Sequence, residues 1–101
     1  MRAQAIGGLS GEATTIAVEL APYKIGVNNI GPGAIRTPID ASEESDAAAE
    51  AKLMAEIPMR RWGTPDEVAQ LAVYLASDAA AYITGSTFFI DGGMLRNAGS
   101  L

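Results

Sequence analysis

The chain has 101 residues and a formal net charge of −5, which fits one small domain and disfavours a nucleic-acid binder, whose surface carries a basic stripe. Histidine and cysteine are both absent, so the commonest metal ligands, the commonest general base and any disulfide are missing. The sequence also has no apolar run long enough for a membrane span or a secretory signal, and we expect a cytoplasmic protein without metal.

The first predicted element is a helix from Ala5 to Ala21. Its apolar residues recur with a spacing of three and four, and Pro22 marks its end. Three glycines, at 7, 8 and 11, lower the helix propensity of its first half. They indicate either a frayed start or a close approach to another element.

A strand is predicted from Ile25 to Ile30, and it runs directly into the tripeptide Gly-Pro-Gly at 31–33. Glycine permits unusual backbone angles and close approach, while proline fixes φ and removes a donor. Such a turn at the carboxyl end of a strand is where an open α/β sheet binds its ligand. Taken alone, such a motif more often marks a plain strand-to-loop turn, because short motifs match by chance. We call residues 32–38 the elbow.

Three further elements follow. Residues 40–50 are acidic and poor in large apolar side chains, which predicts a loop leading into a short helix from Ala47 to Glu56; the charges themselves fit a solvated surface. A helix is predicted from Thr64 to Ala76, with Thr64 as N-cap and Glu67 completing a capping box. A second strand is predicted from Thr87 to Ile90.

The predicted order is therefore helix, strand, helical crossover, strand. Two strands separated by a long helical connection form a parallel pair with a right-handed crossover. Two strands alone make a poor sheet, and parallel strands need helices on both faces. The fold class is α/β, and the chain is expected to be the C-terminal part of a doubly wound Rossmann fold, a single partial domain over residues 1–101.

Five separated blocks carry a resemblance to a known family. They are residues 17–28, 32–38, 57–69, 75–85 and 91–93, in the order AVELAPYKIGVN, PGAIRTP, IPMRRWGTPDEVA, LASDAAAYITG and DGG. Together they cover most of the chain and resemble the C-terminal portion of the short-chain dehydrogenase/reductase family. Within it, the blocks around residues 28–35 and 57–59 look most like bacterial glucose 1-dehydrogenases. They are also similar to 3-oxoacyl reductases.

The resemblance implies an oxidoreductase that uses NAD or NADP. It places Pro32 and Gly33 along the nicotinamide ring, the backbone of Ile35 at the carboxamide, and the hydroxyl of Thr37 in a hydrogen bond to the same group. Residues 38–57 would form the mobile substrate loop. Arg36 could contact a phosphate or lie at the surface, and Tyr82 matches a packing position rather than the catalytic acid.

The chain departs from the family pattern at its start. The family requires a tyrosine and a lysine four residues apart, and Arg2 and Ile6 stand at those two positions. Neither can act as a general acid or base near neutral pH. We therefore expect no catalytic residue in this chain, which would be a truncated oxidoreductase, inactive alone, for an alcohol or sugar substrate.

The alternative is a non-enzymatic fragment. It would self-associate as a homo-oligomer, or join a full-length subunit of the same family, through uncovered strand edges and apolar faces.

Overall fold

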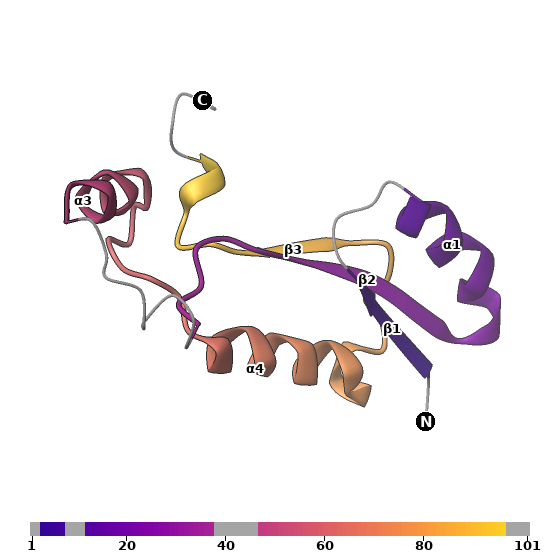
Figure 1. Ribbon diagram of the computed structural model, residues 1–101. Coiled ribbons are helices and arrows are strands. Elements are labelled where there is room, and N and C mark those ends of the chain that lie inside the picture. The colour runs from indigo at the N-terminus through magenta and orange to yellow at the C-terminus, as the bar shows by residue number, and fades with distance from the viewer. Residues whose placement is uncertain (1–2, 8–11, 38–46, 97–101) are drawn as a thin grey trace. The chain divides into compact units, whose positions relative to one another are not determined.

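The fold is taken from a computed structural model, which describes residues 3–7, 12–37 and 47–96. These described residues form three strands and three α-helices, with short 3₁₀ turns between some of them (Figure 1). The described chain divides into two compact units. The first holds residues 1–31 and 69–89, and the second holds residues 32–68 and 90–101.

A parallel sheet of three strands runs in the order β1 (Ala3–Gly7), β2 (Ile25–Pro32), β3 (Thr87–Ile90). Ala3 pairs with Ile25 and Gly7 with Asn29, so β1 and β2 advance in the same direction. On the other side, the Asn29 N–H donates to the Ser86 carbonyl at 2.9 Å and the Gly33 N–H to that of Ile90 at 3.1 Å. From the first hydrogen bond to the second, the residue numbers increase in both strands, so β2 and β3 are parallel. This confirms the predicted parallel pair and the α/β class.

The structure differs from the prediction at the start of the first predicted helix. Residues 5–7 were expected to begin a helix, but they belong to β1; α1 runs only from Glu12 to Leu20 and continues as a 3₁₀ turn, Ala21–Tyr23. The physical reason lies in β2, whose residues 26–31 are all buried. A central parallel strand needs a hydrogen-bonded neighbour on each edge, and the glycine-weakened segment supplies the second one.

The remaining predicted elements are confirmed. Helix α3 spans Ala47–Glu56, helix α4 spans Pro65–Ala76 with Thr64 before it, and β3 begins and ends where expected. Strand β2 continues two residues beyond the expected end, to Pro32.

Within the first unit, Asn28 joins β2 to the segment before β3. Its side chain is 1% exposed, donates to the Ile83 carbonyl at 3.2 Å and accepts from the Ser86 N–H at 3.1 Å. The Thr84 hydroxyl accepts from the Val27 N–H at 3.0 Å. Gly85, with φ of 75°, donates its own N–H to the Val27 carbonyl at 2.8 Å. The block containing Thr84 and Gly85 therefore stabilises the sheet through hydrogen bonds to β2.

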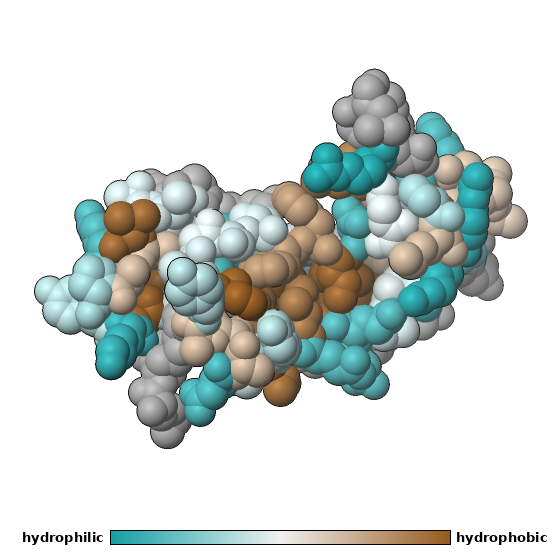
Figure 2. Space-filling view, turned by 180° about the vertical axis from the view of Figure 1, so that it is seen from behind, coloured by the Kyte–Doolittle hydropathy of each residue, from teal (hydrophilic) through white to brown (hydrophobic). Residues whose placement is uncertain are grey.

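Among the residues whose burial the structure describes, few apolar side chains are buried. Ala17 of α1, Leu75 of α4 and Ala80 are at most 1% exposed in the first unit, and Ile57 is 1% exposed in the second. Figure 2 shows apolar residues reaching the surface. Large apolar side chains that are exposed in the first unit include Ile16, Val18, Tyr23, Val73, Tyr74, Tyr82 and Phe89. None of the described helices is long and apolar enough to cross a membrane.

Candidate functional site

The elbow leaves β2 at Gly33, which packs directly on the backbone of Asp91. A Cβ atom built on Gly33 would stand 2.6 Å from the Asp91 Cβ and 2.9 Å from its Cα, closer than such atoms approach. Gly33 is not among the described glycines with positive φ, which are Gly85, Gly92 and Gly93. Its lack of a side chain therefore permits close approach between two protein segments, where sequence reasoning had considered unusual backbone angles and the approach of a ligand.

The turn at Asp91 to Gly93 is held by its own side chain. One Asp91 carboxylate oxygen accepts from the Gly93 N–H at 2.8 Å and the other from the Leu95 N–H at 3.1 Å, which starts the 3₁₀ turn Met94–Arg96. Gly92 and Gly93 have φ of 63° and 92°, a region that favours glycine. The Gly92 carbonyl accepts from the Met59 N–H at 3.0 Å. The Asp-Gly-Gly block thus links the elbow to the segment that follows α3.

A short parallel bridge fixes the middle of the elbow. Ile35 pairs with Gly63: the Arg36 N–H donates to the Gly63 carbonyl at 3.0 Å, and the Gly63 N–H donates to the Ala34 carbonyl at 2.9 Å. In such a bridge the N–H and C=O of Ile35 itself point to the opposite side. No hydrogen bond to either group is made by the part of the chain that the structure describes.

Beside this bridge, one carboxylate oxygen joins three segments. Glu50 Oε1, on α3, accepts from Arg36 Nη2 at 2.7 Å and from the Trp62 indole Nε1 at 3.1 Å. The Arg36 guanidinium also lies over the Trp62 ring, 4.6 Å from its centroid. The two side chains of the ion pair are about one-third exposed, at 35% for Arg36 and 33% for Glu50. We call Arg36, Glu50 and Trp62 the Glu50 cluster.

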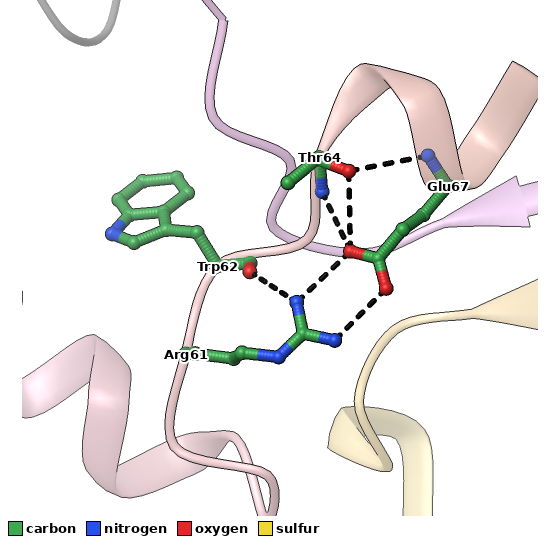
Figure 3. Close-up of polar contacts among 4 residues, drawn as sticks. All are labelled: Arg61, Trp62, Thr64 and Glu67. Atoms are coloured by element: carbon green, nitrogen blue, oxygen red, sulfur yellow. Dashed lines mark hydrogen bonds and ion pairs between the residues drawn. The ribbon is translucent and has the colours of Figure 1, made fainter.

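The start of α4 is fastened by a second ion pair (Figure 3). Arg61 reaches both carboxylate oxygens of Glu67, at 2.9 and 2.8 Å. The Glu67 carboxylate accepts from the Thr64 N–H at 3.0 Å, and the Thr64 hydroxyl accepts from the Glu67 N–H at 3.2 Å, which confirms the predicted capping box. The hydrogen bonds from Arg61 and Thr64 lower the pKa of Glu67 to about 2, and Glu67 raises the pKa of Arg61.

All four residues assigned to the cofactor by resemblance, Pro32, Gly33, Ile35 and Thr37, lie in the second unit. Pro32 is exposed, and the other three are partly buried. The expected substrate loop, 38–57, divides: residues 38–46 lie outside the described residues, 47–56 form α3, and Ile57 is buried.

Arg36, left open between phosphate contact and surface, is held by Glu50 and Trp62 instead. Sequence reasoning missed this cluster, because its hydrogen bonds join residues 14 and 12 positions apart.

A cavity of about 610 Å³ lies in the first unit, and sequence reasoning missed it as well. The described residues that line it are Ala21, Lys24, Ile25, Asp78, Ala81, Tyr82 and Thr84. Its threonine hydroxyl already accepts from the Val27 N–H, and the Tyr82 side chain is fully exposed. The packing position expected for Tyr82 is therefore not seen within the described chain, because its side chain is exposed.

Comparison with known proteins identifies the family. Residues 3–95 match a family model described as enoyl-(acyl carrier protein) reductase. Over 80 residues the chain is 50% identical to 3beta-hydroxysteroid dehydrogenase 1 of Eggerthella lenta, covering 79% of this chain and 31% of that protein.

Solved structures agree. A 4-hydroxyisoleucine dehydrogenase complexed with NADH superposes with a TM-score of 0.81 at 35% identity, over 87% of this chain and 36% of that one. A putative 2-deoxy-D-gluconate 3-dehydrogenase from Agrobacterium tumefaciens with bound NADP gives a TM-score of 0.79 at 38% identity, over 86% and 35% of the two chains.

The chain belongs to the short-chain dehydrogenase/reductase family and has its Rossmann fold. It spans about a third of the length of the relatives it matches. Solved relatives carry NADH or NADP, so a nicotinamide cofactor is a property of the family.

Proposed function

We propose that this chain forms the nicotinamide-side part of an NAD(P)-dependent oxidoreductase that acts on an alcohol group. The observation that carries the proposal is the bridge between Ile35 and Gly63, which leaves the N–H and C=O of Ile35 directed to the side away from Gly63. A carboxamide offers one acceptor and two donors, and an adjacent backbone donor and acceptor complement it. Thr37, two residues on, adds a hydroxyl that can donate and accept.

Pro32 and Gly33 would flank the ring. Gly33 packs closely on Asp91 and donates its N–H to the Ile90 carbonyl at 3.1 Å, and both contacts exist without a ligand. Preorganisation of this kind lowers the entropy lost on binding. A bound nicotinamide would supply the hydride acceptor, while this chain would orient its carboxamide.

Proton transfer is not assigned to this chain. None of its three tyrosines, at 23, 74 and 82, has a lysine four residues further on. Arg2 lies outside the described residues, and Ile6 pairs with Asn28 in the sheet. We therefore expect no oxidation of an alcohol by the chain alone.

The substrate stays at the level of class. The relatives named above are a hydroxysteroid, a hydroxyisoleucine and a deoxygluconate dehydrogenase, so the names alone do not select one alcohol. Glucose remains our specific proposal, from the resemblance around residues 28–35 and 57–59.

Calorimetric titration with NAD⁺, NADP⁺ and nicotinamide mononucleotide tests the proposal. We expect binding of the nicotinamide-containing ligands, weakened in Thr37→Val, which removes the hydroxyl at nearly constant volume. Thr87→Val is the matched control, since Thr87 is exposed on β3 in the first unit. Equal affinity in both variants would contradict the role of Thr37, and no binding by the wild-type chain would contradict the proposed function.

A second candidate is an association module, supported by the exposed apolar side chains of the first unit, among them Val18, Tyr23 and Val73 at about 70% exposure. Exposed apolar patches mark interaction surfaces. Light scattering coupled to size-exclusion chromatography tests it: a concentration-dependent oligomer is expected, and a compact monomer at all concentrations would exclude it.

A further inference from the structure

The Glu50 cluster stands directly beside the part of the elbow to which we assign the carboxamide. Arg36 follows Ile35 in the bridge and Trp62 precedes Gly63, so the two stacked side chains flank the paired residues. The bridge itself has only two hydrogen bonds, at 3.0 and 2.9 Å. A ladder this short is marginal by itself, and side-chain contacts across it decide whether it persists.

Glu50 reaches this bridge from a different element. It lies in the first turn of α3, and its one oxygen accepts from both partners, Arg36 Nη2 at 2.7 Å and Trp62 Nε1 at 3.1 Å. The carboxylate therefore orients the guanidinium and the indole at the same time. Charge-assisted hydrogen bonds are short and strong. A guanidinium that is already stacked on an aromatic ring loses less rotamer entropy when it pairs with a carboxylate.

We propose that Glu50 is a positioning residue for the elbow, which holds Arg36 against Trp62 and thereby fixes the backbone of Ile35 for the nicotinamide carboxamide. The role of Ile35 toward the carboxamide rests on the proposed function. The restraint that Glu50 places on Arg36 and Trp62 does not, because it exists without a ligand. The sequence had placed Glu50 only in the expected substrate loop, 38–57, as one charge of an acidic segment.

Hydrogen exchange of two amides tests the restraint in the absence of nucleotide. The Arg36 and Gly63 N–H groups donate across the bridge, and their exchange reports its opening. In Glu50→Gln, which keeps the shape and removes the charge, both amides are expected to exchange roughly threefold to tenfold faster. The Asn29 and Gly85 amides, bonded to Ser86 and Val27 in the first unit, should not change.

A matched control and a second variant complete this arm. Glu19→Gln removes one charge from α1 in the first unit and should leave the exchange of both bridge amides at the wild-type rate. Trp62→Phe keeps an aromatic ring below Arg36 but deletes the donor to Glu50, and should accelerate the same two amides to a lesser degree. If Glu50→Gln fails to fold, Trp62→Phe carries the test. Unchanged exchange of Arg36 and Gly63 in the folded Glu50 or Trp62 variant would overturn the proposal.

Trp62 is the only tryptophan, so its emission reports the cluster without a label. Glu50→Gln should shift the emission to longer wavelength and make it more accessible to acrylamide, whereas Glu19→Gln should leave both at wild-type values. An unchanged Trp62 spectrum in Glu50→Gln would also overturn the proposal.

The nucleotide arm separates the two hypotheses. If the wild-type chain binds a nicotinamide nucleotide, Glu50→Gln should raise its Kd by the factor by which it lowers the closed fraction of the bridge, which the exchange of the Arg36 and Gly63 amides reports, since only the closed bridge presents Ile35. A Kd that stays at the wild-type value while this closed fraction falls would overturn the link to the carboxamide. Absence of wild-type binding would contradict the proposed function, while the exchange and emission results would still decide whether Glu50 restrains the elbow.

Discussion

Gly33 and Asp91 are in such close contact that no side chain fits between them. A Cβ on Gly33 would lie 2.6 Å from the Asp91 Cβ and 2.9 Å from its Cα, and the Gly33 N–H is already bonded to the Ile90 carbonyl at 3.1 Å. The obstructing atoms belong to or adjoin the backbone, so they cannot rotate away. The glycine of the elbow is thus required by the protein itself, before any cofactor is considered.

Gly33→Ala is therefore expected to destabilise the second unit by about 1–3 kcal/mol, the range found when extra carbon is forced into a packed site. Urea unfolding monitored by Trp62 fluorescence measures this, because the only tryptophan lies in that unit.

Gly63→Ala is the matched control for Gly33→Ala. Its added Cβ would meet Ile35 Cδ1 at 2.7 Å, but that atom is the end of a flexible side chain. A loss of less than about 1 kcal/mol is expected, because the isoleucine can change rotamer. If both alanine variants lose equal stability, the contact with the Asp91 backbone does not explain Gly33.

Two glycines with similar φ should respond differently to alanine. Gly85 and Gly92 have φ of 75° and 63°, so alanine strains the backbone at both. At Gly85 the new Cβ would lie 3.6 Å from the Ala17 Cβ, an ordinary contact, whereas at Gly92 it would lie 2.8 Å from Ile57 Cγ2. Gly85→Ala is expected to cost about 1–2 kcal/mol and Gly92→Ala more, by thermal unfolding. A smaller loss at Gly92 would contradict the packing of Ile57.

Acid should loosen the start of α4. The pKa of Glu67 is lowered to about 2 in the folded chain by its hydrogen bonds to Arg61 and Thr64, from an ordinary value of 4.5. The stabilisation is therefore present above the ordinary value and is lost as the pH falls from 4.5 toward 2. Comparison of Tm between wild type and Glu67→Gln across this range isolates the effect from other carboxylates.

The expected result is a Tm advantage of the wild type at neutral pH that shrinks below the ordinary pKa and disappears near the lowered one. Both partners are partly exposed, at 55% for Arg61 and 38% for Glu67, so added salt should reduce the advantage. A difference in Tm that does not depend on pH would show that the carboxylate charge is not what fastens α4.

Local signals explain what the sequence predicted correctly. The capping box of Thr64 and Glu67 involves residues three apart, and the bounds of α3 and β3 follow from nearby composition. The errors have a different cause. Residues 3–7 form a strand because buried β2 needs a second neighbour, a demand that arises only in the folded sheet.

The same limit applies to the candidate site. The elbow is visible in the sequence because its glycines and prolines are adjacent. Its supports, Asp91 against Gly33 and Glu50 against Arg36, come from other segments, and spacing along the chain carries no signal for them.

Asn28 offers a test of the sheet that is independent of the elbow. Its buried amide donates to the Ile83 carbonyl at 3.2 Å and accepts from the Ser86 N–H at 3.1 Å, so it needs both a donor and an acceptor. Asn28→Asp keeps the acceptor, loses the donor and places a buried carboxylate near a carbonyl oxygen. Asn28→Leu keeps the approximate volume and loses both bonds. Each should destabilise the first unit by about 1–3 kcal/mol near neutral pH.

The two variants of Asn28 differ in their dependence on pH. A protonated aspartic acid can again donate, so Asn28→Asp should regain stability as the pH falls toward the pKa of the buried acid, which desolvation raises. Asn28→Leu should show no such recovery relative to wild type. Thermal unfolding followed by circular dichroism across acidic pH distinguishes them, and parallel pH profiles of the two variants would show that the amide donor to Ile83 is dispensable.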